Sequence, residues 1–369
     1  GLNLRLVHIP GETDDQMGVW YPDKQAFMCA DDVYRTFPNL YAIRGTPSRN
    51  VLPWIESIDK MRMLQPEFLV PSHTRHLRGK EFIRQTLTDY RDAIQYIHDQ
   101  TLRYMNKGYY PEDIVPLVKL PDKLADNPWL FELYGTTEWS VRAVFDQYMG
   151  WFSGNVAQLK SVPSKEKSAK IVSLGGGVKT VCNKAKDYLK NKDPQWALEL
   201  ATHALDVSPG DTLCKETRLE AIKVLASQQT SANGRNYYLT VALEDYNLVD
   251  TKVTPRMRMK GIVSKTAKEL MQILRTKLIA ENCLDFQTIA VFNFTDTEEV
   301  FTLIIRNGIL EVQEGQPAHW EVKVTVTLET WKDILVSVRS PLSAYIAGEL
   351  KINGGITALR AFMGNFERE

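Results

Sequence analysis

Two apolar runs meet in the stretch HIPGETDDQMGVWYPDKQAFMCADDVY, residues 8–34, where the turn sequence PDK lies between MGVWY and QAFMCA. Short apolar runs on either side of a Pro-Asp turn predict a β-hairpin. Acidic residues flank this hairpin, in GETDD before the first run and in ADD after the second. Strand ends are fixed in space by a rigid sheet, so we expect the hairpin to aim these carboxylates into a common cleft.

The hairpin belongs to an α/β pattern that covers residues 1–77. The run LRLVHI precedes it, and the helical sequence IESIDKMRMLQ and the run EFLVP follow it. The order strand, hairpin, helix and strand is typical of an α/β domain.

Helical periodicity replaces this pattern over residues 78–230. An apolar stripe of helical period runs through residues 81–108, and its members are Phe82, Leu87, Tyr90, Ile94, Ile97 and Leu102. Further amphipathic segments are SVRAVFDQYMGWF, KTVCNKAKDYLKN, PQWALELATHALDVSPG and LCKETRLEAIKVLASQQ. The last three resemble stacked helical hairpins of the tetratricopeptide kind. We therefore expect this region to be all-α.

Strand signals return over residues 240–369. The runs QTIAVFNF, EVFTLII and ILEVQEG are separated by the turn signals TDTE and RNG, and WEVKVTVTLETWKDILV follows them. This order predicts an antiparallel meander that leads into a helix. Further helices are expected at residues 262–281 and 341–364, which makes the region α+β.

Composition places the chain among globular proteins of two or three domains, because 369 residues with 44% hydrophobic content can build several cores. Lys+Arg and Asp+Glu balance at 45 each, so no basic field would attract nucleic acid. The four cysteines form no CxxC pair, and we expect them to be buried free thiols.

Targeting signals give little information. No apolar run approaches the roughly 20 residues that span a bilayer, so we expect no transmembrane segment. The chain begins without Met or a signal sequence, and we expect it to be a fragment. Its compartment is therefore left open.

The acidic motifs occur in an order that resembles a family of hydrolases. PGET at 10–13, CADD at 29–32 and PSH at 71–73 resemble the later metal-binding motifs of the metallo-β-lactamase superfamily, in its alkylsulfatase branch. The resemblance implies that Glu12, Asp31 and His73 are metal ligands. It also implies two zinc ions (Zn²⁺) per complete protomer. Two close cations need several anionic ligands, which carboxylates at strand ends supply.

The rest of the chain resembles the same branch. SVRAVFDQYMGWFSGN at 140–155 is similar to its dimerisation domain, and AGELKINGGITALRAFMGNF at 347–366 is similar to its sterol-carrier-like C-terminal domain. The resemblance implies a homodimer and a fold in three parts. These are an α/β metallo-β-lactamase part, half of an αββα domain (1–77), an all-α dimerisation domain (78–230) and an α+β sterol-carrier-like domain (240–369).

The activity that the resemblance implies is zinc-dependent hydrolysis of alkyl sulfate esters to an alcohol and inorganic sulfate, with hydroxide as the nucleophile. Arg44 and Asn39 resemble the residues that hold the sulfate, which a planar guanidinium and a neutral amide donor suit. The family motif HxHxDH is absent, so the fragment alone is expected to be inactive. Family members carry His where this chain has Pro38 and Trp139, which leaves the proton donor open.

Each acidic residue also has a purely structural interpretation. An acidic GETDD turn is ordinary in a solvated loop, and Asp14 and Asp15 compete with Glu12 for the same role. Asp31 and Asp32 would also suit the N-terminal cap of a helix.

Similar alternatives remain for the basic residues and for the function. His73 and His76 would be ordinary surface residues, and Arg44 would pair with a surface carboxylate. A different functional class is a non-catalytic, dimerising lipid-binding protein, whose activity would reside in the sterol-carrier-like domain. Within the same fold, another anionic ester or a thioester is an alternative substrate.

Overall fold

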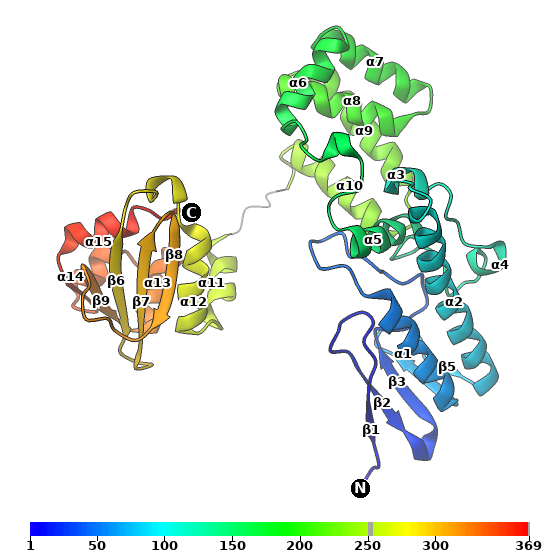
Figure 1. The fold of residues 1–369 in the computed structure, drawn as a ribbon, viewed down its shortest axis with the longest axis horizontal. Helices are drawn as coiled ribbons and strands as arrows, with labels where there is room; N and C mark the ends of the chain where they lie inside the picture. The colour runs from blue at the N-terminus through cyan, green and yellow to red at the C-terminus, as the bar shows by residue number, and fades with distance from the viewer. Residues whose placement is uncertain (250–253, 368–369) are drawn as a thin grey trace. The chain divides into compact units, whose positions relative to one another are not determined.

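The computed structural model describes residues 1–249 and 254–367 of the chain. The chain forms two compact units, 1–250 and 251–369 (Figure 1). Each unit has a hydrophobic core of its own. The first unit combines an α/β part with a helical part and the second is α+β, which confirms the predicted fold classes. The predicted domain limits stay predictions, and residues 250–253 and 368–369 of the predicted last domain lie outside the described residues.

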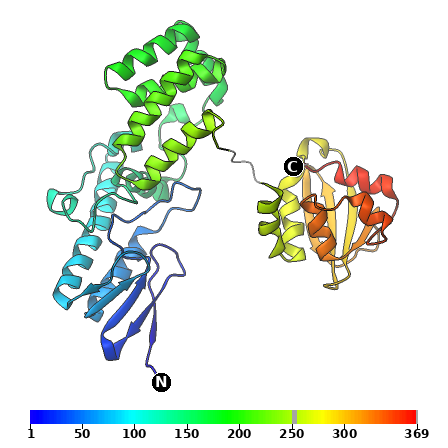
Figure 2. The ribbon, with the colours of Figure 1, turned by 180° about the vertical axis from the view of Figure 1, so that it is seen from behind.

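A mixed sheet forms one end of the first unit, with the strand order β1-β2-β3-β4-β5. Its strands are β1 (Arg5–His8), β2 (Met17–Tyr21), β3 (Ala26–Ala30), β4 (Phe68–Pro71) and β5 (Leu77–Arg78). β3 and β4 are parallel because α1 (Val51–Leu64) connects them, and the other neighbours are antiparallel. Figures 1 and 2 show α1 and the long α2 (Lys80–Met105) beside this sheet.

The two faces of this sheet differ, as alternation along a strand requires. Phe27 and Leu69 point into a core that they share with Trp54 of α1, and all three are fully buried. Met28 and Val70, which are register partners on β3 and β4, remain exposed on the other face. The direction of a side chain in β3 therefore decides how much its packing contributes to stability.

Truncation of the adjacent side chains Phe27 and Met28 should have very different effects. We expect Phe27→Ala to lower the free energy of unfolding by about 3–5 kcal/mol, because it leaves a cavity in a fully buried site. Met28→Ala should cost less than about 1 kcal/mol, since Met28 is 37% exposed. Urea unfolding followed by tryptophan fluorescence measures both values. Equal costs would contradict the described orientation of β3.

Helices form the remainder of the first unit. They are α3 (Pro111–Ile114), α4 (Asp122–Ala125), α5 (Thr137–Met149), α6 (Ser164–Leu174), α7 (Val178–Lys190), α8 (Pro194–Val207), α9 (Thr212–Gln228) and α10 (Ala232–Asp245). α2 buries the predicted apolar stripe at Tyr90 and Ile94. The prediction that Phe82 belongs to this stripe is wrong, because Phe82 is 52% exposed and Ile83 takes the inward position. α7, α8 and α9 pack on one another, as expected of helical hairpins.

A disulfide joins Cys182 of α7 to Cys214 of α9, with 5.1 Å between their Cα atoms. The prediction that all four cysteines are free thiols is therefore wrong for these two. They are 32 residues apart in the sequence, and only the packing of α7 against α9 brings them together. Cys29 and Cys283 are free and buried, as predicted.

The disulfide should contribute measurably to the stability of the helical part. A closed loop of 32 residues stabilises a fold by about 3–4 kcal/mol through the entropy of the unfolded chain. We expect the double substitution Cys182→Ala, Cys214→Ala to lower the melting temperature by roughly 10 °C. Dithiothreitol should have a similar effect on the wild type and none on the double variant. A wild-type melting curve that does not respond to the reductant would argue against the cross-link.

The second unit has its own sheet, with the strand order β10-β9-β6-β7-β8. Its strands are β6 (Thr288–Phe294), β7 (Glu299–Arg306), β8 (Ile309–Glu314), β9 (Val322–Val326) and β10 (Leu350–Asn353). Its helices are α11 (Pro255–Val263), α12 (Ala267–Leu274), α13 (Leu328–Leu335), α14 (Pro341–Ile346) and α15 (Ile356–Met363). β6, β7 and β8 form the predicted meander, but β9 pairs parallel with β6, so a purely antiparallel sheet is the wrong prediction.

The predicted helix over residues 341–364 is also wrong as a single element. β10 interrupts it and pairs antiparallel with β9. Gly354 and Gly355 have φ angles of 92° and 95°, which end any continuous helix. A Cβ at position 354 would lie 2.0 Å from the carbonyl oxygen of Glu321, so glycine is required where these segments cross.

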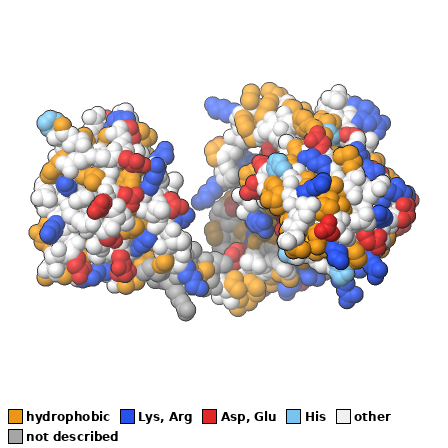
Figure 3. Space-filling model, turned by 90° about the horizontal axis from the view of Figure 1, so that it is seen from below, with side chains coloured by type: hydrophobic (Ala, Val, Ile, Leu, Met, Phe, Trp, Pro, Cys, Tyr) orange, Lys and Arg blue, Asp and Glu red, His pale blue; other side chains and the backbone are white. Residues whose placement is uncertain are grey.

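Charge and apolar character are mixed over the surface. Figure 3 shows acidic and basic side chains interspersed on both units, in keeping with the balanced composition. Across residues 1–249 and 254–367, no helix combines the length and the apolar character that crossing a membrane requires.

Candidate metal and anion site

Three turns at one edge of the first sheet carry the predicted metal ligands. Glu12 lies between β1 and β2, Asp31 directly follows β3, and His73 follows β4. Because β2 is antiparallel to β3 and β4 is parallel to it, the start of β2 and the ends of β3 and β4 lie at the same edge. The topology of the sheet therefore gathers residues that are far apart in the sequence.

Asp32, next to the predicted ligand Asp31, is fully buried. Its Oδ1 accepts a hydrogen bond of 3.1 Å from the backbone N–H of Glu12, and its carbonyl oxygen accepts one of 2.9 Å from the Trp54 indole. A Cβ at Gly11 would lie 2.4 Å from Asp32 Oδ1, so a side chain at position 11 would displace the carboxylate. The PGET turn is thus folded directly onto a buried acid.

Glu12 forms an ion pair with Arg49, whose Nη2 contacts its Oε1. The Glu12 side chain is 13% exposed and the Arg49 side chain 9%. Burial raises the pKa of Glu12, and the Arg49 guanidinium opposes that rise. The competing acids Asp14 and Asp15 are exposed, and Asp15 accepts a hydrogen bond from the Thr13 hydroxyl. Glu12 is therefore the partly buried acid of this turn.

Asp31 and His73 lie side by side, with 3.6 Å between Asp31 Oδ1 and His73 Nε2. The His73 side chain is largely exposed and that of Asp31 about one third exposed, so the imidazole is accessible from solvent. The charge of Asp31 also raises the pKa of Glu12, which shows that the two carboxylates are close enough to interact. The structure thus places Asp31 beside His73 and within electrostatic reach of Glu12. The role of these three residues as metal ligands stays a prediction.

Buried oxygen atoms that lack hydrogen-bond partners indicate whether these residues suit a cation. Asp31 Oδ1 and Asp32 Oδ2 are buried, and neither has a hydrogen-bond partner among the described residues. Burial raises the pKa of Asp32 to about 8; the N–H of Glu12 opposes the rise, and the charges of Glu12 and Asp31 add to it. A divalent cation would offset this repulsion, and carboxylate and imidazole donors suit zinc. The chemical types of these donors therefore suit a metal, but among the described residues Glu12, Asp31, Asp32 and His73 do not bring three donor atoms within 4.8 Å of one another.

The predicted anion-binding residues differ in their surroundings. The backbone N–H of buried Asn39 donates to the Tyr34 hydroxyl at 3.1 Å, and its carbonyl oxygen accepts from Arg49. Both polar side-chain atoms of Asn39 are buried, with no hydrogen-bond partner in the described part of the chain. Arg44 is exposed, and its charge lowers the pKa of Glu12, which places it near the cluster. Asn39 therefore has unused hydrogen-bonding capacity but is buried, whereas Arg44 is accessible from solvent. Their role in binding an anion stays a prediction.

Two residues of the cluster, Asp32 and Arg49, are not predicted from the sequence. The sequence offers Asp32 only the alternative of a helix cap shared with Asp31, but α1 begins at Val51 after Asn50, so neither acid caps it. Arg49 is the second arginine of RGTPSRN, and nothing in the sequence distinguishes it from an ordinary surface arginine. Both residues are identified by their burial and partners.

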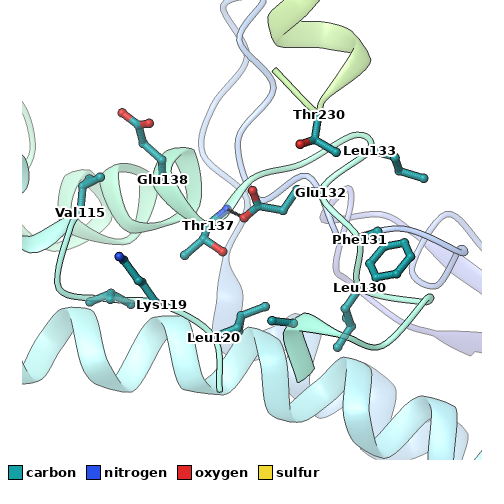
Figure 4. Close-up of a pocket in the computed structure, with 12 residues that line it drawn as sticks. Val115, Lys119, Leu120, Leu130, Phe131, Glu132, Leu133, Thr137, Glu138 and Thr230 are labelled. Carbon is teal, nitrogen blue, oxygen red and sulfur yellow. Dashed lines mark hydrogen bonds between the residues drawn. The ribbon is translucent and has the colours of Figure 1, made fainter. Parts of the chain in front are cut away.

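A separate cavity of about 570 Å³ lies in the helical part of the first unit (Figure 4). Its wall is mostly apolar, from residues such as Val115, Leu120 and Leu130, with Lys119 among its polar members. Glu132 accepts a hydrogen bond of 2.6 Å from the backbone N–H of Thr137 and so caps the start of α5. None of the predicted site residues lines this cavity.

Known proteins match this chain along its whole length. Family models described as alkyl sulfatase dimerisation and alkyl sulfatase C-terminal match residues 110–247 and 257–369. A linear primary-alkylsulfatase of a Pseudomonas strain is 31% identical over 380 residues, which covers 100% of this chain and 72% of the relative. An alkyl/aryl-sulfatase of Saccharomyces cerevisiae is 26% identical, which covers 100% of this chain and 57% of the relative.

A solved structure has the same fold. The stereoselective inverting sec-alkylsulfatase of Pseudomonas sp. matches with a TM-score of 0.87 and 25% identity, over 100% of this chain and 59% of that chain. The chain thus spans 56–72% of the length of the curated relatives that it matches.

The raised pKa of Asp32 predicts how the metal-free chain responds to pH. Between the ordinary value of 3.8 and about 8, the unfolded chain releases a proton that the folded chain keeps. The free energy of unfolding should therefore fall as the pH rises through this window, by on the order of a few kcal/mol. Asp32→Asn should remove most of this dependence, as urea unfolding with a chelator at about pH 5 and about pH 8 would measure. Equal pH dependence in the wild type and the variant would contradict the assignment.

Proposed function

The chain belongs to the alkylsulfatase family, and from this premise we propose that the protein hydrolyses alkyl sulfate esters to an alcohol and inorganic sulfate, with two zinc ions in each complete protomer. The names of its relatives support this reaction class. Since the chain spans only part of the length of those relatives, the activity is proposed for the whole protein.

The observation that carries the proposal is the buried oxygen Asp32 Oδ2, which has no hydrogen-bond partner in the described residues, together with buried Asp31 Oδ1, which lies 3.6 Å from His73 Nε2. A buried carboxylate oxygen without a donor or a cation is costly. His73 lies beside Asp31 and Glu12 lies within electrostatic reach of it, so a cation at this edge of the sheet would find several donors. A solvated acidic loop would not bury these atoms, which favours the metal interpretation.

The residues of the cluster would have different roles in the reaction. Glu12, Asp31 and His73 would hold the metal, and Asp32 offers a further carboxylate. When bound, zinc acts as a Lewis acid and lowers the pKa of a water towards about 7. Asn39 would donate its side-chain N–H to a sulfate oxygen, and Arg44 would stabilise the charge of the anion from the solvent side.

The helical part would join two protomers into a homodimer. The family model described as alkyl sulfatase dimerisation covers residues 110–247. Within this range Trp151 and Val156 are largely exposed and Tyr148 is half exposed. Exposed aromatic and aliphatic side chains are typical of protein–protein interfaces, so we place the contact between protomers on this segment.

Sulfate release from a linear alkyl sulfate tests the proposed function. Glu12→Gln and Asp31→Asn should each lower the rate by at least about 100-fold, because each removes an anionic metal ligand. Metal analysis should show two zinc ions per wild-type protomer and fewer in the variants. Asp59→Asn is the matched control: it removes a carboxylate that pairs with Arg91, outside the cluster, and should leave the rate unchanged. Full activity in both ligand variants would reject the site assignment.

A second candidate, a lipid-binding protein without hydrolase activity, is favoured by one feature of the second unit. Leu342 and Ile346 lie four residues apart on α14, Val338 lies shortly before this helix, and all three are largely exposed. Exposed apolar side chains of this kind are suited to an alkyl chain. The wild type would then release no sulfate, and a fluorescent fatty acid would bind equally to the wild type and to Glu12→Gln.

A further inference from the structure

Arg49 lies where separate segments of the first unit meet. Its Nη2 pairs with Glu12 in the turn between β1 and β2, and its Nη1 donates to the carbonyl oxygen of Asn39. Its own carbonyl oxygen accepts a hydrogen bond from the side-chain amide of Gln147 on α5. A single residue therefore contacts the proposed metal ligand, the segment of the proposed anion-binding residue and the helical part.

The guanidinium suits this junction by its burial and its shape. The Arg49 side chain is 9% exposed, so water and salt screen its ion pair with Glu12 only weakly. Its planar fork offers N–H groups to two acceptors at fixed angles, which the single ammonium group of a lysine does not reproduce. The contact engages Oε1 of Glu12 and so orients the whole carboxylate.

We propose that Arg49 is a positioning residue that couples the metal half of the site to its anion half. It orients Glu12 through one carboxylate oxygen and leaves the other for the cation, and it holds the Asn39 segment through the backbone carbonyl. Ligating carboxylates are commonly oriented by such a hydrogen bond, and its loss costs about 10–100-fold in metal affinity. This inference deepens the proposed function and rests on it.

A purely structural role, in which Arg49 only ties its loop to Glu12 and α5, has different consequences. Loss of a structural brace lowers the melting temperature. Loss of an orienting contact changes the affinity and the coordination geometry of the metal even in a folded protein. Arg91 offers a matched control, because its Nε pairs with Asp59 at 3.0 Å, between α2 and α1 and outside the cluster.

Metal titration of the whole protein and of Arg49→Lys, Arg49→Gln and Arg91→Gln separates these roles. Competition with a chromophoric chelator measures the Zn²⁺ affinity, and the visible absorption of the Co²⁺-loaded protein reports the coordination geometry. We expect Arg49→Gln to bind Zn²⁺ about 10–100-fold more weakly, with an altered cobalt spectrum. Arg49→Lys, which keeps the charge but loses the fork, should lie between Arg49→Gln and the wild type. Arg91→Gln should match the wild type in both measurements.

The outcomes distinguish failure of the inference from failure of the proposed function. Circular dichroism first identifies the folded variants, and Arg49→Lys carries the test if Arg49→Gln does not fold. Wild-type Zn²⁺ affinity and an unchanged cobalt spectrum in the folded Arg49 variants would overturn the positioning role and leave the metal site intact. If the wild type binds neither cation, the proposed function fails and the inference falls with it.

Discussion

Burial of the Asp32 carboxylate is the constraint on which the site depends. A carboxylate that leaves water needs donors or a cation, and Asp32 Oδ1 receives the backbone N–H of Glu12 while Oδ2 has no hydrogen-bond partner within the described residues. Room for the acid exists because Gly11 has no side chain, and Trp54 of α1 fixes the backbone of Asp32 by a hydrogen bond. The first turn, the end of β3 and α1 are held in one arrangement around this buried carboxyl group.

The helical part also supports the segment that carries Asn39, the proposed anion-binding residue. A Cβ at Gly135 would lie 2.0 Å from the carbonyl oxygen of Pro38, so the segment before α5 packs directly against the segment that carries Asn39. The N–H of Phe37 donates to the carbonyl oxygen of Phe131 at 2.9 Å and ties the same two segments together. The Asn39 loop therefore depends on contacts from the helices as well as from the sheet.

Local patterns predicted much of this architecture but could not identify which acid is buried. The turn PDK and the runs around it indicated the hairpin correctly, because turn residues and alternation act between near neighbours. Alternation fails at the end of β3, where the pairing shifts register between Met28 and Ala30 and Ala30 has a φ of 50°. Across such a bulge a period of two no longer assigns a face, so Asp31 and Asp32 could not be told apart.

The sequence by itself determined the order of the elements around the first sheet and in the meander β6, β7 and β8, and the acidic residues at the strand ends, since apolar periodicity and turn chemistry depend on a few neighbouring residues. The tertiary structure decided that Arg49 pairs with Glu12, that Asp32 is buried, and that α7 and α9 are cross-linked through Cys182 and Cys214. These contacts join residues that are distant in the chain. They depend on how the elements pack on one another, and no local pattern encodes that packing.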